Sequence, residues 1–445
     1  MRPTTHAVVL GGGLAGMLAA AALARHLEKV TIIERDSVPD GPEPRRGIPQ
    51  ARHSHLLWSG GARAIEALLP GTTEALLAAG AHRNGMPSGL VLLTAHGWLR
   101  RWPETQFMIT CSRDLLDWTV RRRLLENPRV TLRQGLRAVG VTGTGERVTG
   151  ARVRDEKTGE TFELAADLVV DASGRASRAR QWLVETGLPP VREEVVDSGL
   201  AYATRIFRAP STAGKDFPVI TVQADPRDGE PGRGGVLLPI EGDRWLVTIS
   251  GTRGGEPPTD EERFLDFARA LRSPILADLV EGAEPLTPVH GSHSTANRRR
   301  YFERLRAWPE GFVVVGDAVA ALNPVYGQGM SVLAECAVAV DRVLRRHGTR
   351  PGAARRIQRE IARPVSGAWK TATGQDLQFP DVVGPRPSAV DRLLLGYVNR
   401  LVRTSLARPA AAEAFFEAIT LSGPMTRLVT PRALLTTLRG PPLPP

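Results

Sequence analysis

The stretch that decides the fold runs from His6 to Glu34 and reads HAVVLGGGLAGMLAAAALARHLEKVTIIE. Residues 6–10 have the composition of a short buried strand. Three consecutive glycines follow and argue against one continuous helix, because each glycine costs about 1 kcal/mol relative to alanine inside a helix. We therefore predict a strand over 6–10, a tight turn over 11–16, a helix over 14–26 and a second strand over 30–34. This is the beginning of a βαβ unit.

The glycines of the turn form the pattern Gly-x-Gly-x-x-Gly. Gly11 permits the turn, Gly13 lets a pyrophosphate approach the backbone, and Gly16 lets the helix pack closely on the strand. Glu34 lies 18 residues after Gly16, at the end of the second strand. A carboxylate there accepts hydrogen bonds from the ribose hydroxyls of an adenosine and repels a 2′-phosphate. We therefore expect FAD or NAD at this first site rather than NADP.

A membrane-spanning helix or a signal peptide is the alternative for this stretch, because residues 7–24 carry no charge. The glycines count against both, and the chain has no other apolar run of that length. We expect a cytoplasmic protein. The only two cysteines, Cys111 and Cys336, lie far apart and predict neither a disulfide nor a Cys/His metal site.

The composition bounds the remaining possibilities. The 445 residues suffice for about three domains, and 42% hydrophobic residues exclude wholesale disorder. The net charge of +11 comes almost entirely from arginines scattered along the chain. We expect no nucleic-acid partner, and we expect the charge to attract small anions or phosphate-bearing cofactors instead.

The rest of the chain predicts an α/β (α+β) protein with three parts. Helices are expected over 54–69, 73–79, 112–126, 260–271 and 330–346. Residues 167–171 and 312–316 are continuous apolar runs, typical of central parallel strands, whereas 200–206, 236–240 and 245–249 alternate as in antiparallel sheets. Beyond 351, helices are expected over 353–362, 388–406, 410–421 and 431–438.

These patterns give a discontinuous Rossmann-like FAD/NAD(P)-binding domain with an inserted sheet and a helical end. The dinucleotide-binding domain comprises residues 1–84, 105–185 and 286–350. A mostly antiparallel β-sheet substrate domain comprises 85–104 and 186–285, and the C-terminal helical region comprises 351–445.

Three segments together resemble the class A FAD-dependent monooxygenases, which have the p-hydroxybenzoate hydroxylase fold. They are the glycine turn with Glu34, the run ADLVVDASGRASRAR over 166–180, and Gly316-Asp317 followed by NPVYGQGM over 323–330. Within this family the chain looks most similar to the bacterial polyether/polyene epoxidases, relatives of squalene epoxidase. Residues 45–55 (RRGIPQARHSH) and the helical C-terminus carry that closer resemblance.

The resemblance implies a role for each matching residue. Asp317 would bond to the ribitol hydroxyls of FAD, and Arg113 would neutralise the pyrophosphate. The turn before the helix at 330 would aim backbone amides at the N1–C2=O edge of the flavin, which stabilises the reduced cofactor. The implied FAD contacts are Gly11, Gly13, Leu14, Ala15, Gly16, Glu34, Arg35, Arg46, Arg113, Asp317, Pro324, Gly327, Gly329 and Met330. Arg45, in the same loop, is the second choice after Arg46.

One departure leaves the electron donor open. The family's second motif usually contains Asp-Gly, where this chain has Ser173-Gly174. Electrons are expected from NADPH, from NADH or from a partner flavin reductase.

The resemblance also implies the chemistry. Reduced FAD adds O₂ at its C4a position, and the flavin hydroperoxide transfers one oxygen atom to an electron-rich carbon of an apolar substrate. Epoxidation of an alkene in a polyketide or terpenoid needs no side-chain base and is the first expectation. Hydroxylation of an aromatic or polyketide ring, which benefits from a base, is the second. An isoprenoid reductase is the third, and a halogenase of this fold would carry Trp-x-Trp-x-Ile-Pro, which is missing here.

No catalytic residue can be assigned, because the chain shows no Ser/His/Asp or paired-carboxylate arrangement. His55, Tyr202, Phe207 and Trp245 are candidate substrate contacts, although a helix start for His55 and core packing for the aromatic residues are the simpler interpretations. Residues 393–398 (LLLGYV), flanked by arginines, form an apolar stripe. We expect it to pack on the flavin domain, with peripheral membrane contact as the alternative.

Overall fold

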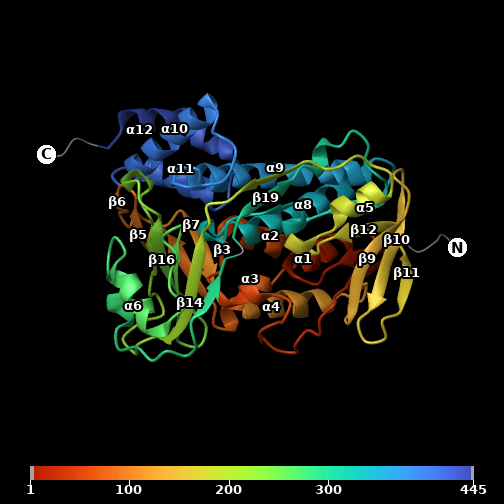
Figure 1. Ribbon diagram of the computed structural model, residues 1–445, viewed down its shortest axis with the longest axis horizontal. Coiled ribbons are helices and arrows are strands. Elements are labelled where there is room, and N and C mark those ends of the chain that lie inside the picture. The colour runs from red at the N-terminus through yellow and green to blue at the C-terminus, as the bar shows by residue number, and fades with distance from the viewer. Residues whose placement is uncertain (1–4, 294, 442–445) are drawn as a thin grey trace.

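The computed structural model describes residues 5–293 and 295–441, so the expected domain ends at 1 and 445 lie outside the described residues. A five-stranded parallel sheet forms the half of the molecule on the right of Figure 1. Each neighbouring pair in it is parallel, and the central strand is the one predicted before the glycine turn. In order across the sheet the strands are β20 (Phe312–Val314), β12 (Leu168–Asp171), β1 (His6–Leu10), β2 (Lys29–Ile33) and β8 (Val130–Arg133).

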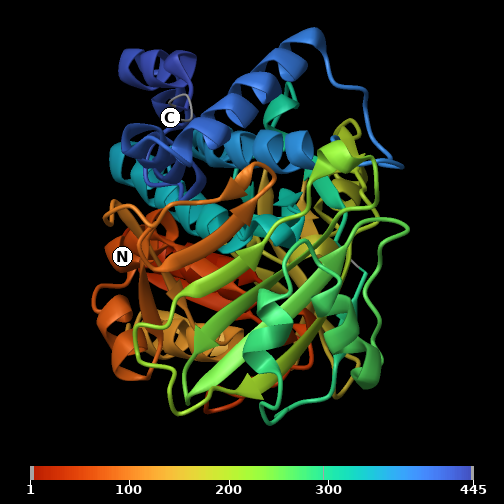
Figure 2. The same ribbon diagram turned by 90° about the vertical axis from the view of Figure 1, so that its left-hand side faces the viewer.

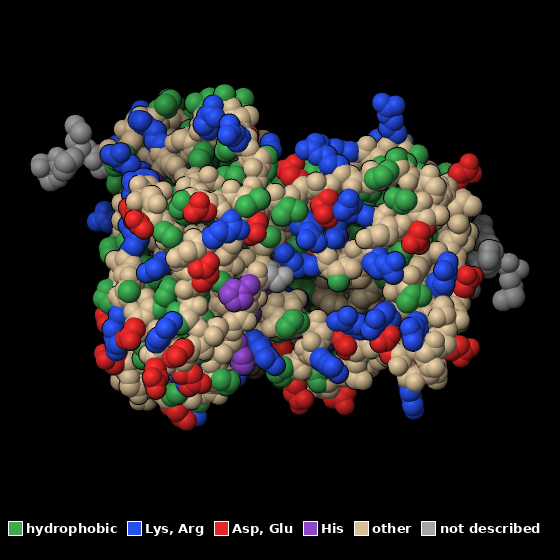
Figure 3. All heavy atoms as spheres, in the orientation of Figure 1, with side chains coloured by type: hydrophobic (Ala, Val, Ile, Leu, Met, Phe, Trp, Pro, Cys, Tyr) green, Lys and Arg blue, Asp and Glu red, His purple; other side chains and the backbone are tan. Residues whose placement is uncertain are grey.

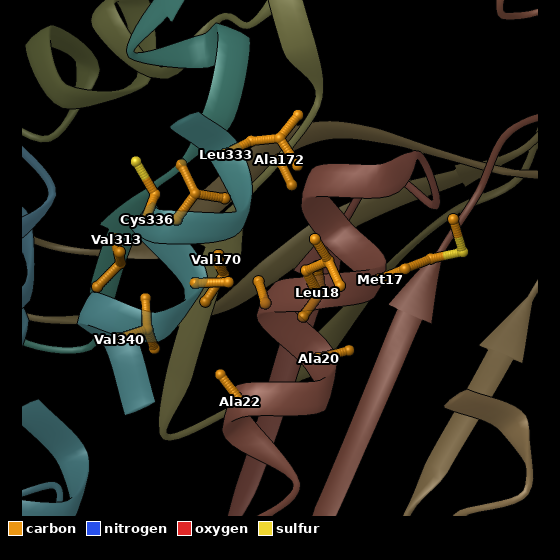
Figure 4. Close-up of a cluster of buried hydrophobic side chains, with 14 of the residues drawn as sticks. Met17, Leu18, Ala20, Ala22, Val170, Ala172, Val313, Leu333, Cys336 and Val340 are labelled. Carbon is orange, nitrogen blue, oxygen red and sulfur yellow. The ribbon is translucent and has the colours of Figure 1, made fainter. Parts of the chain in front are cut away.

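The main helices pack together on one face of this sheet. Figure 1 shows α8 (Gly329–His347) and α9 (Ala353–Asp376) toward the top of this half and α4 (Arg113–Leu125) toward the bottom. The helix after the glycine turn contacts both α8 and α4. The glycine turn leads into α1 (Leu14–Leu23), whose small side chains let α8 approach closely. Figure 4 shows Val170 of β12 between α1 and α8, so the core of this half lies where these elements meet. The other helices of this half are α2 (Ser59–Leu68), α3 (Thr72–Ala78) and α5 (Ala179–Glu185).

Three small sheets flank this layer. They are β9 (Leu136–Gly143) with β10 (Val148–Asp155) and β11 (Thr161–Ala165); β3 (Leu56–Trp58) with β7 (Gln106–Thr110) and β4 (His82–Met86); and β13 (Glu193–Val196) with β19 (Asn297–Arg300) and β21 (Ala320–Ala321).

The second large sheet has seven strands and is antiparallel except where β15 meets β5. One face packs against α6 (Glu261–Arg269) and α7 (Ile275–Val280), and the other face looks toward the C-terminal helices. In order the strands are β18 (His290–Ser292), β14 (Ala201–Arg208), β17 (Arg244–Gly251), β16 (Arg233–Ile240), β15 (Val219–Val222), β5 (Leu90–Thr94) and β6 (Gly97–Trp98).

The C-terminal helices lie over this second sheet, as Figure 2 shows. They are α10 (Ala389–Ser405), α11 (Pro409–Ile419) and α12 (Pro431–Arg439). Phe416 of α11 is fully buried against strands of the sheet. The expectation that the stripe over 393–398 packs on the flavin domain is wrong for its first residues, because α10 packs mainly on α11 and α12 and Leu393 is 75% exposed. Among the described residues, no helix combines the length and apolar character needed to cross a bilayer.

Two predicted helices have other boundaries than expected. Residues 56–58 form β3 instead of the start of a helix, because they pair with β7, and the helix begins only at Ser59. The helix expected to stop at 362 continues through Pro364 to Asp376. An internal proline costs about 3 kcal/mol, but the buried face of α9 continues past it with Val365, Ala368 and Trp369. The fold class and the order of the predicted elements are otherwise confirmed.

Candidate cofactor and substrate site

One large cavity of about 2540 Å³ runs from the carboxyl ends of β1 and β2 to the space beneath the C-terminal helices. Figure 3 shows the surface hollowed on this side, with Lys and Arg side chains gathered around the opening. A pocket for one drug-sized ligand has roughly 300–1,000 Å³. The cavity therefore has room for a dinucleotide and a second molecule.

The glycine turn forms one end of this cavity. Gly11 has a φ of +105°, which favours glycine, and a Cβ on Gly16 would lie 1.9 Å from the carbonyl oxygen of Gly11. By contrast, a Cβ on Gly13 would meet nothing within 4 Å, because Gly13 faces the open cavity together with Leu14 and Ala15. No side chain caps the N-terminus of α1, so its first amides are available to an anion such as a pyrophosphate.

Glu34 and Arg45 form a buried ion pair beside this turn. The Glu34 Oε2 atom lies 2.9 Å from an Arg45 guanidinium nitrogen and accepts a hydrogen bond from the Gly12 amide, also at 2.9 Å. Arg45 donates a second hydrogen bond to the Gly12 carbonyl oxygen at 3.0 Å. Both Glu34 and Arg35 line the cavity.

Arg46, the arginine that the sequence favoured, is exposed and does not line the cavity. The assignment of Arg46 to the cofactor is therefore corrected in favour of its neighbour Arg45. Nothing in the local sequence distinguishes two adjacent arginines in an irregular loop. Only the buried carboxylate of Glu34 decides which one turns inward.

Arg113 lies at the start of α4 and is buried against the cavity. Ser112 caps this helix, accepting a hydrogen bond from the Leu115 amide at 3.1 Å. The Nε atom of Arg113 donates to Asp117 at 2.7 Å, which fixes the side chain. Its two terminal nitrogens have no partner among the described residues, so they are free to contact a bound anion.

Asp317 follows β20 and lines the cavity, as do Arg175 and Arg113. Burial raises the pKa of its carboxyl, and the positive charges of Arg175 and Arg113 act in the opposite direction. Arg175 is half-buried at the cavity and donates to the carbonyl oxygen of Ala296 at 2.7 Å. Arg175 belongs to the second quoted motif, yet sequence reasoning assigned it no role.

The turn before α8 forms another part of the cavity wall. Pro324, Gly327, Gly329 and Met330 all line it, and no side chain caps the N-terminus of α8. A Cβ on Gly329 would meet nothing within 4 Å. The first amides of α8 thus face open space, as the amides of α1 do.

A residue far along the chain fixes this turn. Asp376 of α9 is buried and accepts hydrogen bonds from Asn297, Asn323 and Tyr326 at 2.6–3.1 Å. Burial raises the pKa of the Asp376 carboxyl, while these donors act to lower it. Sequence reasoning missed Asp376, because no motif marks it and its partners lie about 50–80 residues earlier.

Two histidines face the middle of the cavity and stay neutral at neutral pH. Burial, with smaller electrostatic contributions from His55, His290 and Arg52, lowers the pKa of His53 to about 4. Burial and the charge of Arg113 lower the pKa of His55 to about 3. His55 precedes β3, so the expectation that it starts a helix is wrong.

The three candidate aromatic residues lie on opposite faces of the second sheet. Tyr202 lines the cavity. Phe207 and Trp245 pair across β14 and β17 and pack in the core beneath α6 and α7. Their assignment to the substrate is corrected, because successive residues of a strand point to opposite faces. Among the described residues, no group of His, Cys, Asp and Glu is placed to hold a metal ion.

Taken together, these groups fit FAD. The uncapped N-terminus of α1, beside Gly13, would hold the phosphates, to which Arg113 adds a positive charge. The uncapped N-terminus of α8, at Gly329, would face the flavin edge. Glu34 and Asp317 offer carboxylates to its ribose and ribitol hydroxyls.

Comparison with known proteins agrees with this geometry. A family model described as "FAD binding domain" matches residues 4–345. The chain is 31% identical to "Protein Rv3254" of Mycobacterium tuberculosis, over 85% of this chain and 81% of that protein. It is 29% identical to a squalene monooxygenase of Mus musculus, over 73% of this chain and 52% of that protein. The solved structure of p-nitrophenol 4-monooxygenase PnpA from Pseudomonas putida DLL-E4 superposes with a TM-score of 0.64 at 17% identity, covering 96% and 99% of the two chains, which shows a shared fold.

Proposed function

We propose that this chain, which belongs to the FAD-binding-domain family of FAD-dependent monooxygenases, epoxidises an alkene in an apolar polyketide or terpenoid intermediate. The observation that carries the proposal is an apolar arm of the cavity between the second sheet and α11. We define the apolar arm by Leu56, Trp58, Leu92, Val236, Phe415 and Ile419. A hydrocarbon chain in this arm would be removed from water, which stabilises binding by roughly 25 cal/mol per Å² of apolar surface.

The reaction balances with one reductant. An alkene, O₂, a reduced nicotinamide dinucleotide and a proton give the epoxide, the oxidised dinucleotide and water. Bound FAD supplies the chemistry that activates O₂. The work of the protein is to hold the double bond close to the flavin and to exclude water from the cavity.

The titration of the cavity histidines favours epoxidation over ring hydroxylation. Hydroxylation of a phenol benefits from a base that takes its proton, and such a base is most efficient when its pKa lies near the working pH. His53 and His55, with pKa values lowered to about 4 and about 3 chiefly by burial, are poor bases at neutral pH. Epoxidation makes no such demand.

The electron donor is part of the proposal. Arginines around the opening of the cavity suit the phosphates of NADH or NADPH, and a partner flavin reductase would replace both. Oxidation of NADH and NADPH by FAD-loaded protein, followed by absorbance, separates these donors. If neither dinucleotide is oxidised while chemically reduced enzyme still converts the substrate, a partner reductase is required.

The test of the reaction uses FAD-loaded protein with candidate polyenes under isotopically labelled O₂. We expect a product heavier by one labelled oxygen atom, with the loss of one pair of alkene proton signals. A product that gains the oxygen but keeps every alkene signal and loses an aromatic proton would establish hydroxylation instead. Equal conversion without O₂ would show a reductase.

A further inference from the structure

A series of hydrogen bonds links His53 to Ser54 through two threonines. The Nδ1 atom of His53 lies 2.9 Å from the Thr204 hydroxyl, which lies 2.7 Å from the Thr248 hydroxyl. The Thr248 hydroxyl in turn lies 2.6 Å from the hydroxyl of Ser54. Thr204 and Thr248 are direct partners on β14 and β17, so the two strands fix the middle of the series.

Ser54, at the end of this hydrogen-bond series, keeps either a donor or an acceptor unused. Each hydroxyl has one proton to donate, and neutral His53 has Nδ1 either as donor or as acceptor. If His53 Nδ1 donates to Thr204, then Thr204 donates to Thr248 and Thr248 donates to Ser54. The Ser54 hydroxyl proton then has no acceptor in the series. If His53 Nδ1 accepts, every hydrogen bond has the opposite direction, and Ser54 donates to Thr248. The Ser54 oxygen can then still accept a hydrogen bond. No other side-chain partner of Ser54 exists among the described residues.

Ser54 lies at a boundary within the cavity. His53, Ser54 and Thr248 line the cavity, and Thr204 is fully buried behind them. Along β17 the side chains on this face change from Leu246, in the core beside the apolar arm, to Thr248 and then Ser250. The cavity therefore has an apolar arm and, next to it, a hydroxyl-lined end.

We infer that Ser54 and Thr248 form a subsite for a hydroxyl or carbonyl group of the substrate. The substrate class is then an alkene-bearing alcohol or ketone rather than a pure hydrocarbon. This inference rests on the proposed function, since it places the remaining apolar part of the same molecule in the apolar arm. A group that both donates and accepts suits the subsite, because the series can present either polarity at Ser54.

A site that hydrogen-bonds a substrate hydroxyl discriminates against the analogue without it, since its polar groups would be left unpaired. We expect FAD-loaded protein to bind farnesol roughly tenfold more tightly than farnesene, which has a similar hydrocarbon skeleton. Binding is measured from the change in flavin absorbance on titration, with both probes delivered from cyclodextrin.

Thr248→Val removes the central hydroxyl at nearly constant volume. We expect it to weaken farnesol binding by about three- to tenfold and to leave farnesene binding unchanged. Ser54→Ala should have the same selective effect. Thr131→Val is the matched control. Thr131 is an exposed residue of β8 that does not line the cavity, so this variant should change neither affinity.

Equal affinities of the wild-type protein for farnesol and farnesene, or no binding of either, would overturn the subsite. An equal loss for both probes in Thr248→Val would show a structural role only. The failure of the proposed function looks different. In that case the preference for farnesol persists and depends on Thr248, but no epoxide forms under O₂.

Discussion

At the scale of single residues, the adjacent Arg45 and Arg46 lie in opposite environments, one buried and the other exposed. Arg45 turns inward, because the buried carboxylate of Glu34 and the Gly12 carbonyl oxygen accept its hydrogen bonds. Arg46 remains in solvent. The ion pair ties the loop after β2 to the glycine turn, so the shape of the dinucleotide end depends on a residue outside that turn.

The Glu34–Arg45 ion pair predicts a large difference in the free energy of unfolding between Arg45→Ala and Arg46→Ala. Arg45→Ala leaves the Glu34 carboxylate buried without its cation, which costs roughly 3 kcal/mol of the free energy of unfolding. Arg46→Ala removes an exposed charge and should change this free energy by less than about 0.5 kcal/mol. Urea unfolding followed by circular dichroism measures both. Equal losses in the two variants would contradict the assignment of Arg45 as the inward residue.

At the scale of elements, α9 reaches from the C-terminal region into the cofactor site. It packs along α8, runs past Pro364 and ends with Asp376 beside the turn over 323–326. The turn itself was identified from its sequence, but nothing in that sequence indicates the carboxylate that fixes it. The signal lies in the buried face of α9, whose period continues beyond the proline.

Replacing Asp376 by asparagine tests this arrangement. The variant keeps the volume but turns one acceptor into a donor that faces Asn297 and Asn323. We expect the free energy of unfolding to fall by about 2 kcal/mol and FAD to bind more weakly, because the turn before α8 loses its anchor. Fluorescence titration with FAD measures the affinity in the refolded apoprotein.

Asp381→Asn is the control, since Asp381 is exposed a few residues beyond α9. It should leave both quantities unchanged. If Asp376→Asn binds FAD as well as the wild-type chain, the role of Asp376 in positioning the turn is refuted.

At the scale of the whole molecule, the cavity joins both large sheets and the C-terminal helices in one site. The parallel sheet supplies the dinucleotide end, and the second sheet with α11 supplies the apolar arm. His53 and His55 line this cavity, and folding buries His53 and half-buries His55. The stability of the molecule therefore depends on pH.

The sign of this dependence follows from the lowered pKa values. Unfolded histidine takes up a proton below about pH 6.5, whereas His53 and His55 stay neutral in the folded chain down to about pH 4 and about pH 3. Their contribution to stability is complete above about pH 6.5 and decreases as the pH falls toward the folded values, because the unfolded state then binds more protons. Urea unfolding at several pH values should show this decrease.

A His55→Asn variant gives the comparison. Its free energy of unfolding should depend less steeply on pH over the same range, because one of the two histidines no longer titrates on unfolding. A slope equal to that of the wild-type chain would show that His55 is protonated in the folded state.

The sequence by itself determined the start of the parallel sheet, the glycine turn and the continuous strands, because these depend on local propensity and on contacts close along the chain. Gly11, Gly13 and Gly16 are recognisable for that reason, and the family followed from three such motifs. Only the tertiary structure decided which arginine faces Glu34, that Phe207 and Trp245 point away from the cavity, and that Asp376 and Arg175 join the site. These choices depend on burial and on partners distant in sequence, where a strand's two faces or two neighbouring loop residues are equivalent until the chain has packed.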